Sequence, residues 1–168
     1  GYSSAASDVY KRQIMRDIHR MDKAMDEMRT LNMGGTAIGT GINADEGYLR
    51  RIVPNLTEIS GMDFIQAFDL IDSTQNLDPF VAVSGAVKAC AVTLSKMSND
   101  LRLMSSGPRT GFGEINLPAK QNGSSIMPGK VNPVIPEVVN QVAFNIIGND
   151  VTITCLLYTS PSPRDPKT

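Results

Sequence analysis

The fold is decided by residues 78–104, which read DPFVAVSGAVKACAVTLSKMSNDLRLM. Apolar residues recur from Phe80 to Met104 in alternating steps of three and four, the spacing that places side chains on one face of a helix. Asp78 can cap this helix, and Pro79 suits its first turn, where no N–H donor is needed. Because this apolar seam is too long for a compact chain to cover alone, we expect it to pack against partner helices.

The segments on both sides of this helix are also predicted to be helical. A preceding helix that ends at Gly34-Gly35 carries apolar residues at the same spacing, namely Ile14, Ile18, Met21, Met25 and Met28. A shorter helix is expected over residues 44–60, and Pro136 opens a last one. We find no alternation of apolar and polar residues that would indicate a strand. The sequence therefore predicts the all-α class and a bundle of long helices.

Composition excludes several classes of protein. The 168 residues hold 16 Lys+Arg and 17 Asp+Glu, a net charge of −1 that argues against a nucleic-acid-binding surface. No continuous apolar run has the length that a membrane span needs. His19 is the only histidine, so no His-rich metal site is expected. Cys90 is the only cysteine between the two ends of the chain, which favours a reduced, cytoplasmic setting.

The two ends of the chain are expected to be non-native. Codons for Val9–Gln13, read on the reverse complement one base over, encode Cys155–Tyr158 and begin Thr159. An inverted repeat of this kind resembles translated sequencing-library adapters. We therefore set residues 1–13 and 155–168 apart, and take residues 14–154 as the native segment.

A long segment rich in glycine and proline, residues 107–133, separates the last two predicted helices. Loops of this length without regular structure are usually functional or disordered. Its residues 123–133 read GSSIMPGKVNP, and their N–H groups, Lys130 and the Asn132 amide can face an anion, most naturally a carboxylate. On composition alone, a solvated Ser/Gly/Pro loop without a site is the simpler interpretation.

The form Gly-Ser-Ser-x-Met-Pro-x-Lys-x-Asn at residues 123–132 resembles the signature of the fumarase/aspartase superfamily. The resemblance extends to GGTAIGTGIN (34–43), SNDLRLMSSGPR (98–109) and GEINLP (113–118). It implies a fragment of a long-helix bundle that forms a homotetramer, in which three segments from different subunits build each active site. Residues 14–154 match only the third of these segments, so the fragment alone is expected to be inactive.

The run from 132 to 150 is most similar to the ammonia-lyase branch, which converts L-aspartate to fumarate and ammonia. Class II fumarases, which interconvert fumarate and L-malate, share MPGKVNP but differ between Pro133 and Glu137, and they remain the alternative. The resemblance implies a small dicarboxylate substrate and a cytoplasmic enzyme, with no cofactor or metal, and no nucleic acid or membrane as partner.

The resemblance also assigns roles to residues of the signature. Ser124 is the implied general base, which must act as an oxyanion held by loop N–H groups and positive charge, because an ordinary serine is too weak a base. The implied substrate-binding residues are Ser125, Met127, Lys130 and Asn132. Glu137 matches a supporting acidic residue that pairs with a histidine of another family segment, although an acidic residue also suits a helix N-terminus.

Overall fold

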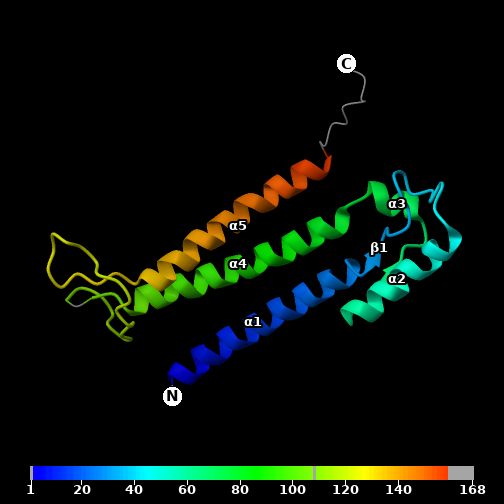
Figure 1. The fold of residues 1–168 in the computed structure, drawn as a ribbon. Helices are drawn as coiled ribbons and strands as arrows, with labels where there is room; N and C mark the ends of the chain where they lie inside the picture. Colours follow the sequence, from blue (N-terminus) through cyan, green and yellow to red (C-terminus); the bar gives the residue numbers. More distant parts are fainter. Residues whose placement is uncertain (1, 108, 159–168) are drawn as a thin grey trace. The chain divides into compact units, whose positions relative to one another are not determined.

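The computed structural model describes residues 2–107 and 109–158 (Figure 1). Its elements are α1 (Tyr2–Glu27), β1 (Thr30–Leu31), α2 (Glu46–Ser60), β2 (Ile65–Gln66), α3 (Leu70–Gln75), α4 (Asp78–Met104) and α5 (Val134–Tyr158). The predicted all-α class is confirmed, since the two strands have two residues each and form one parallel pair. The chain divides into two compact units, one formed by residues up to 18 together with 85–152, the other including residues 19–84.

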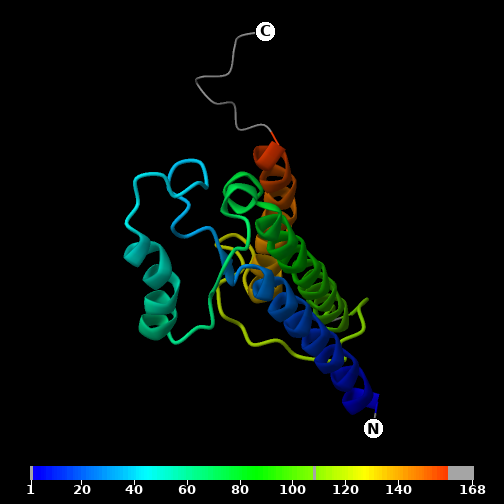
Figure 2. The same cartoon turned by 90° about the vertical axis from the view of Figure 1, so that its right-hand side faces the viewer.

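In the first unit, α4 and α5 lie side by side and run in opposite directions (Figures 1 and 2). The buried apolar residues of α4 and α5 are small, namely Ala86, Ala91 and Ala143, and small side chains allow helices to pack closely. Ion pairs and hydrogen bonds cross the interface from Lys88–Asp150 at one end to Arg102–Glu137 at the other. α4 thus has the partner helix that its long apolar face requires.

α5 begins at Val134, before the predicted start at Pro136. Pro136 lies in the first turn, where a missing N–H breaks no helical bond, so the proline is tolerated inside the helix. α1 and α5 extend into the ends that were set apart, since α1 starts at Tyr2 and α5 reaches Tyr158.

α1 ends at Glu27, well before the predicted end at Gly34-Gly35. The chain leaves the helix because the next backbone groups bond to β2: Ile65 N donates to Arg29 O (2.9 Å), and Ala67 N donates to Leu31 O (2.9 Å). The apolar residues from Ile14 to Met25 thus lie in α1 as predicted, and this tertiary pairing ends the helix before Met28.

The second unit contains α2, α3 and the glycine-rich run 34–41. Asp45 caps α2 by accepting from Tyr48 N, so this helix begins close to the predicted boundary. α3 was not predicted, because six residues are too few to show a helical period. Gly39, with φ +84°, lies so close to α3 that a Cβ there would be 2.3 Å from the Ile71 Cα. This close approach requires glycine at position 39.

By length and averaged hydropathy (1.4), α4 is the one helix in the described part of the chain that could cross a membrane. It has no continuous apolar run of that length, because charged residues interrupt it. Lys88 pairs with Asp150, and Lys96 pairs with Asp100. The core helix of a helical bundle meets the same two criteria. Length and averaged hydropathy therefore do not distinguish a helix that crosses a membrane from a helix inside a bundle.

Candidate functional site

The segment that follows α4 has no helix or strand among its described residues from 105 to 133, as predicted. Its first part folds back on the end of α4, because Gly113 N donates to Ser106 O (2.8 Å) and Glu114 N donates to Met104 O (2.9 Å). The segment then connects the adjacent ends of α4 and α5 (Figure 1). The signature residues are therefore held between the ends of two paired helices.

The signature segment, residues 123–132, contains a closed loop. Gly123 N donates to Lys130 O (3.0 Å), and Lys130 N donates to Met127 O (3.3 Å). A Cβ on Gly123 would lie 2.2 Å from Lys130 O, so this closure has no room for a side chain. Gly129 adopts φ +78°, a backbone conformation that favours glycine. Two glycines thus allow the tight turn that carries the polar residues.

Within this loop, two backbone N–H groups point at one hydroxyl oxygen. The Oγ of Ser124 accepts hydrogen bonds from Ile126 N (3.1 Å) and Met127 N (3.3 Å), and the residue is only partly exposed. Donors that converge on an oxygen stabilise negative charge developing there. The two N–H groups would therefore contribute to stabilising negative charge that develops on the Ser124 oxygen.

A hollow of about 660 Å³ lies against the loop. Ser124, Ser125 and Lys130 line it, whereas Met127 and Asn132 do not. Lys120 also lines it, a residue that the sequence interpretation overlooked, although its charge within the same long loop was a signal. Two lysines and no carboxylate among its lining residues make the hollow suited to an anion.

Glu137 lies in the first turn of α5, partly exposed, outside the residues that line this hollow. Its Oε1 is 3.8 Å from the Nη2 of Arg102 at the end of α4. The carboxylate is therefore placed between the N-terminal end of α5 and a cation at the end of α4, and both interact favourably with a negative charge. Its supporting role in catalysis stays a prediction.

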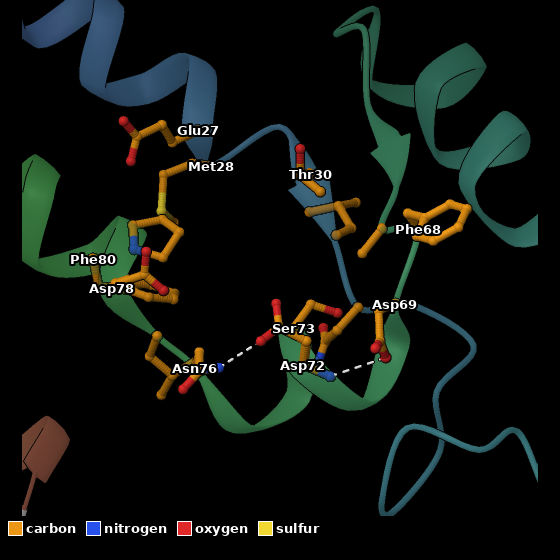
Figure 3. A pocket seen from close by; sticks show the side chains of 15 residues that line it. Glu27, Met28, Thr30, Phe68, Asp69, Asp72, Ser73, Asn76, Asp78 and Phe80 are labelled. Atoms are coloured by element: carbon orange, nitrogen blue, oxygen red, sulfur yellow. Dashed lines mark hydrogen bonds between the residues drawn. The ribbon is translucent and has the colours of Figure 1, made fainter.

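A second hollow, of about 550 Å³, lies in the other unit (Figure 3). It is lined by carboxylates, Glu27, Asp69, Asp72 and Asp78, with no lysine or arginine among its lining residues. Two of these acids already have local structural roles: Asp69 caps α3, and Asp72 accepts from Asn76 Nδ2 (2.6 Å). A dicarboxylate would be repelled here, so this hollow is not the candidate site.

Among the residues that the structure describes, no group of three or more histidine, cysteine or acidic side chains is arranged to hold a metal ion. Neither Cys90 nor Cys155 forms a disulfide bond. The polar side chains that line the hollow at the signature segment are hydroxyls, amides and lysines.

Comparisons with known proteins agree with the signature. A profile of the Lyase family matches residues 5–148. The chain is 52% identical to aspartate ammonia-lyase of Bacillus subtilis, over 89% of this chain and 31% of that protein. It is 60% identical to aspartate ammonia-lyase of Pseudomonas aeruginosa, over 82% of this chain and 29% of that protein. The chain thus spans about a third of the length of these relatives.

Solved structures give the same result. A fumarate lyase:delta crystallin of Brucella melitensis, bound to cobalt, matches 91% of this chain and 33% of its own length, with a TM-score of 0.84 and 47% identity. A class II fumarase of Schistosoma mansoni matches 90% of this chain and 35% of its own, with a TM-score of 0.85 and 31% identity. Fold, signature and relatives together show that the chain belongs to the Lyase family, within the fumarase/aspartase superfamily.

Proposed function

We propose that the complete protein containing this segment is an aspartate ammonia-lyase, which eliminates ammonia from L-aspartate to give fumarate. The observation that carries the proposal is the pair of N–H groups on the Ser124 oxygen, because this elimination needs a base that an ordinary serine cannot provide. The choice of ammonia over water as leaving group is supported by relatives of that name at 52–60% identity, against 31% for the fumarase structure.

In the proposed reaction, Ser124 takes a proton from the carbon beside the side-chain carboxylate of L-aspartate. The electron pair left on this carbon is delocalised into the carboxylate and then forms the carbon–carbon double bond. The carbon–nitrogen bond breaks, ammonia leaves, and the proton stays on Ser124 Oγ until it is returned to solvent. Most of the barrier comes from the doubly charged intermediate, so positive potential at the carboxylate contributes most of the catalysis.

The other signature residues would provide that potential and the shape of the site. Lys130 and Asn132 would bind carboxylate oxygens, Ser125 would contact the substrate or orient the loop, and Met127 would form an apolar wall. Glu137 would support the site from the start of α5. Lys120, which shares the hollow with Ser124 and Lys130, adds a second positive charge beside the base.

The remaining features of the proposal concern the whole protein. Residues 14–154 are its native part here, the assembly is a homotetramer that completes each site with segments from other subunits, and the location is the cytoplasm. Several apolar side chains on α4 and α5 are exposed, which supports the proposal that helices of other subunits pack against them. The exposed side chains include Val87, Leu94, Val138, Val142 and Phe144.

The test is an assay of the complete purified protein with two substrates. We expect fumarate to form from L-aspartate, with release of ammonia, and no comparable formation of fumarate from L-malate. Ultraviolet absorbance of fumarate follows both reactions, and an ammonia assay identifies the first. Turnover of L-malate without turnover of L-aspartate would make the protein a fumarate hydratase and would refute the proposal.

A further inference from the structure

The interface between α4 and α5 contains a buried amide that the proposed chemistry does not use. Asn140, on α5, is 4% exposed. Its Oδ1 accepts a hydrogen bond from the Ser95 hydroxyl (2.8 Å), and its Nδ2 donates to Asn99 Oδ1 (2.9 Å). Ser95 and Asn99 are four residues apart on α4, so they lie on one face of it. One amide of α5 therefore bridges a full turn of the neighbouring helix.

This bridge fixes the position of α5 along the axis of α4. A slide by a single residue moves a helix by about 1.5 Å, which is enough to break both bonds. The amide would then be left in the interface without these partners. The small apolar residues Ala91 and Ala143, which also lie buried in this unit, have no directional bonds that oppose such a slide. Within this interface, the directional constraint near the middle comes from Asn140.

The register of the two helices decides where the signature segment is held. α4 ends at Met104 and α5 begins at Val134, so the two ends of the long loop move with the helices. Asn140 lies less than two turns from the start of α5, and the Arg102–Glu137 pair lies between it and the loop. At 3.8 Å and partly exposed, that pair restrains the helices more weakly than the buried amide does.

We propose that Asn140 is a positioning residue for the elimination reaction: by holding the register of α5 on α4, its side-chain amide sets the geometry of the loop that carries Ser124. The inference rests on the proposed function for its kinetic consequence, but its structural consequence does not depend on which substrate is used. A misplacement of about 1 Å at a catalytic group can cost about 100-fold in rate.

The test compares Asn140→Leu with the wild type in the complete lyase. Leucine keeps a similar volume and removes both hydrogen bonds. We expect kcat for fumarate formation to fall about 10- to 100-fold while KM for L-aspartate changes less than about threefold, because the binding groups stay but the base is displaced. Amide hydrogen exchange in a peptide that covers residues 123–132 should become at least about threefold faster, as the bonds to Ser124 Oγ loosen.

The matched control is Asn145→Leu. Asn145 lies on the same helix, is exposed, and accepts a hydrogen bond from Asn149 Nδ2 (2.8 Å) within α5. We expect this variant to keep the wild-type kcat and the wild-type exchange at residues 123–132. If Asn140→Leu does not assemble, Ser95→Ala removes one of the two bonds at little steric cost, and a fall in kcat of about three- to tenfold is expected.

The outcomes separate the two proposals. Faster exchange with reduced kcat supports the positioning role, whereas unchanged exchange and kcat in a folded Asn140→Leu protein would overturn it. An equal loss in Asn140→Leu and Asn145→Leu would also overturn it, since a general effect on α5 would then be the cause. If the wild type converts L-malate rather than L-aspartate, the proposed function fails, but the exchange experiment and kcat for L-malate still decide the role of Asn140.

Discussion

The α4–α5 helix pair and the segment that joins the two helices differ in their hydrogen bonds and in the exposure of their side chains. The pair is regular, and its polar interactions link side chains of one helix to side chains of the other, with Asn140 and Asp150 almost fully buried. In the joining segment, hydrogen bonds are mostly local, as between Gly123 and Lys130, and most side chains are exposed. Stability is therefore concentrated in the helices and reactive groups in the loop.

An exposed loop with few internal bonds can still hold its polar side chains in a defined geometry. Its own bonds are too few to define a single position, so the fixed helix ends must supply the rest. Substitutions in the loop should therefore affect chemistry more than stability. Substitutions at the end of the helix interface far from the loop, such as the Lys88–Asp150 pair, should affect stability first. Four substitutions follow in order of decreasing expected effect, the first three in the complete lyase and the last in the 168-residue chain.

Ser124→Ala is expected to have the largest effect. Loss of a positioned base should lower kcat about 100-fold or more, while the thermal midpoint stays within about 2 °C, because the hydroxyl bonds only inside the loop. Steady-state kinetics and thermal denaturation measure the two quantities. Ser60→Ala, at an exposed hydroxyl of α2, is the control and should change neither. Near-normal turnover of Ser124→Ala would remove Ser124 as the base.

Gly123→Ala should have the next largest effect. An added Cβ would lie 2.2 Å from Lys130 O, so the loop must open, and we expect kcat to fall about tenfold or more. Gly148→Ala is the matched control, because a Cβ at Gly148 meets nothing within 4 Å inside this chain. It lies in α5, where alanine favours the helix by about 1 kcal/mol. Equal activity of the two variants would contradict the closed loop.

Lys88→Met tests the α4–α5 helix interface. It removes a cation from Asp150, whose side chain is 7% exposed, and should cost about 1–2 kcal/mol, less than a fully buried pair because Lys88 is partly exposed. We expect a fall of about 2–4 °C in the thermal midpoint with kcat unchanged. Arg50→Met is the control, since Arg50–Glu46 is an exposed pair worth about 0.5 kcal/mol or less. A loss of kcat without loss of stability would break the proposed division.

Asp100→Asn should have the smallest effect, visible only through pH. Hydrogen bonds from Lys96 and then Tyr10 lower the pKa of Asp100 below its ordinary value of 3.8. A lowered pKa means that the carboxylate stabilises the fold above its unfolded pKa, and that this stabilisation is lost as pH falls through the folded pKa. Urea midpoints of the 168-residue chain should differ slightly between wild type and variant at about pH 6 and converge below about pH 4. A difference that does not become smaller as the pH falls below about 4 would contradict this origin.

The sequence predicted the helices best where local signals and tertiary packing agree. α4 has the predicted bounds, because Asp78, Pro79 and the apolar seam all favour the same helix, which ends before Gly107-Pro108. The end of α1 was predicted wrongly, since the bonds of Arg29 and Leu31 to a strand far along the chain leave no local trace. α3 was missed because a single short turn has no period to detect.

The candidate site could be located but not assembled from the sequence. The signature marks Ser124 and Lys130, and the structure brings both to one hollow with Ser125. Lys120 lies outside the signature, so its positive charge in the same long loop was the one sequence signal for it, and the structure is needed to place it at the hollow. The sequence does not single out Asn140 among the polar residues of α5, because its burial depends on the register of α5 on α4, which only the structure shows.

Gly39 ties the glycine-rich run to the short helix α3. Its requirement for glycine comes from the close approach to Ile71, where a Cβ would lie 2.3 Å from the Cα, and not from any reacting group. A larger residue at position 39 should therefore push the run 34–41 away from α3 and weaken the folding of the second unit, while the chemistry of the signature segment depends on residues of the first unit.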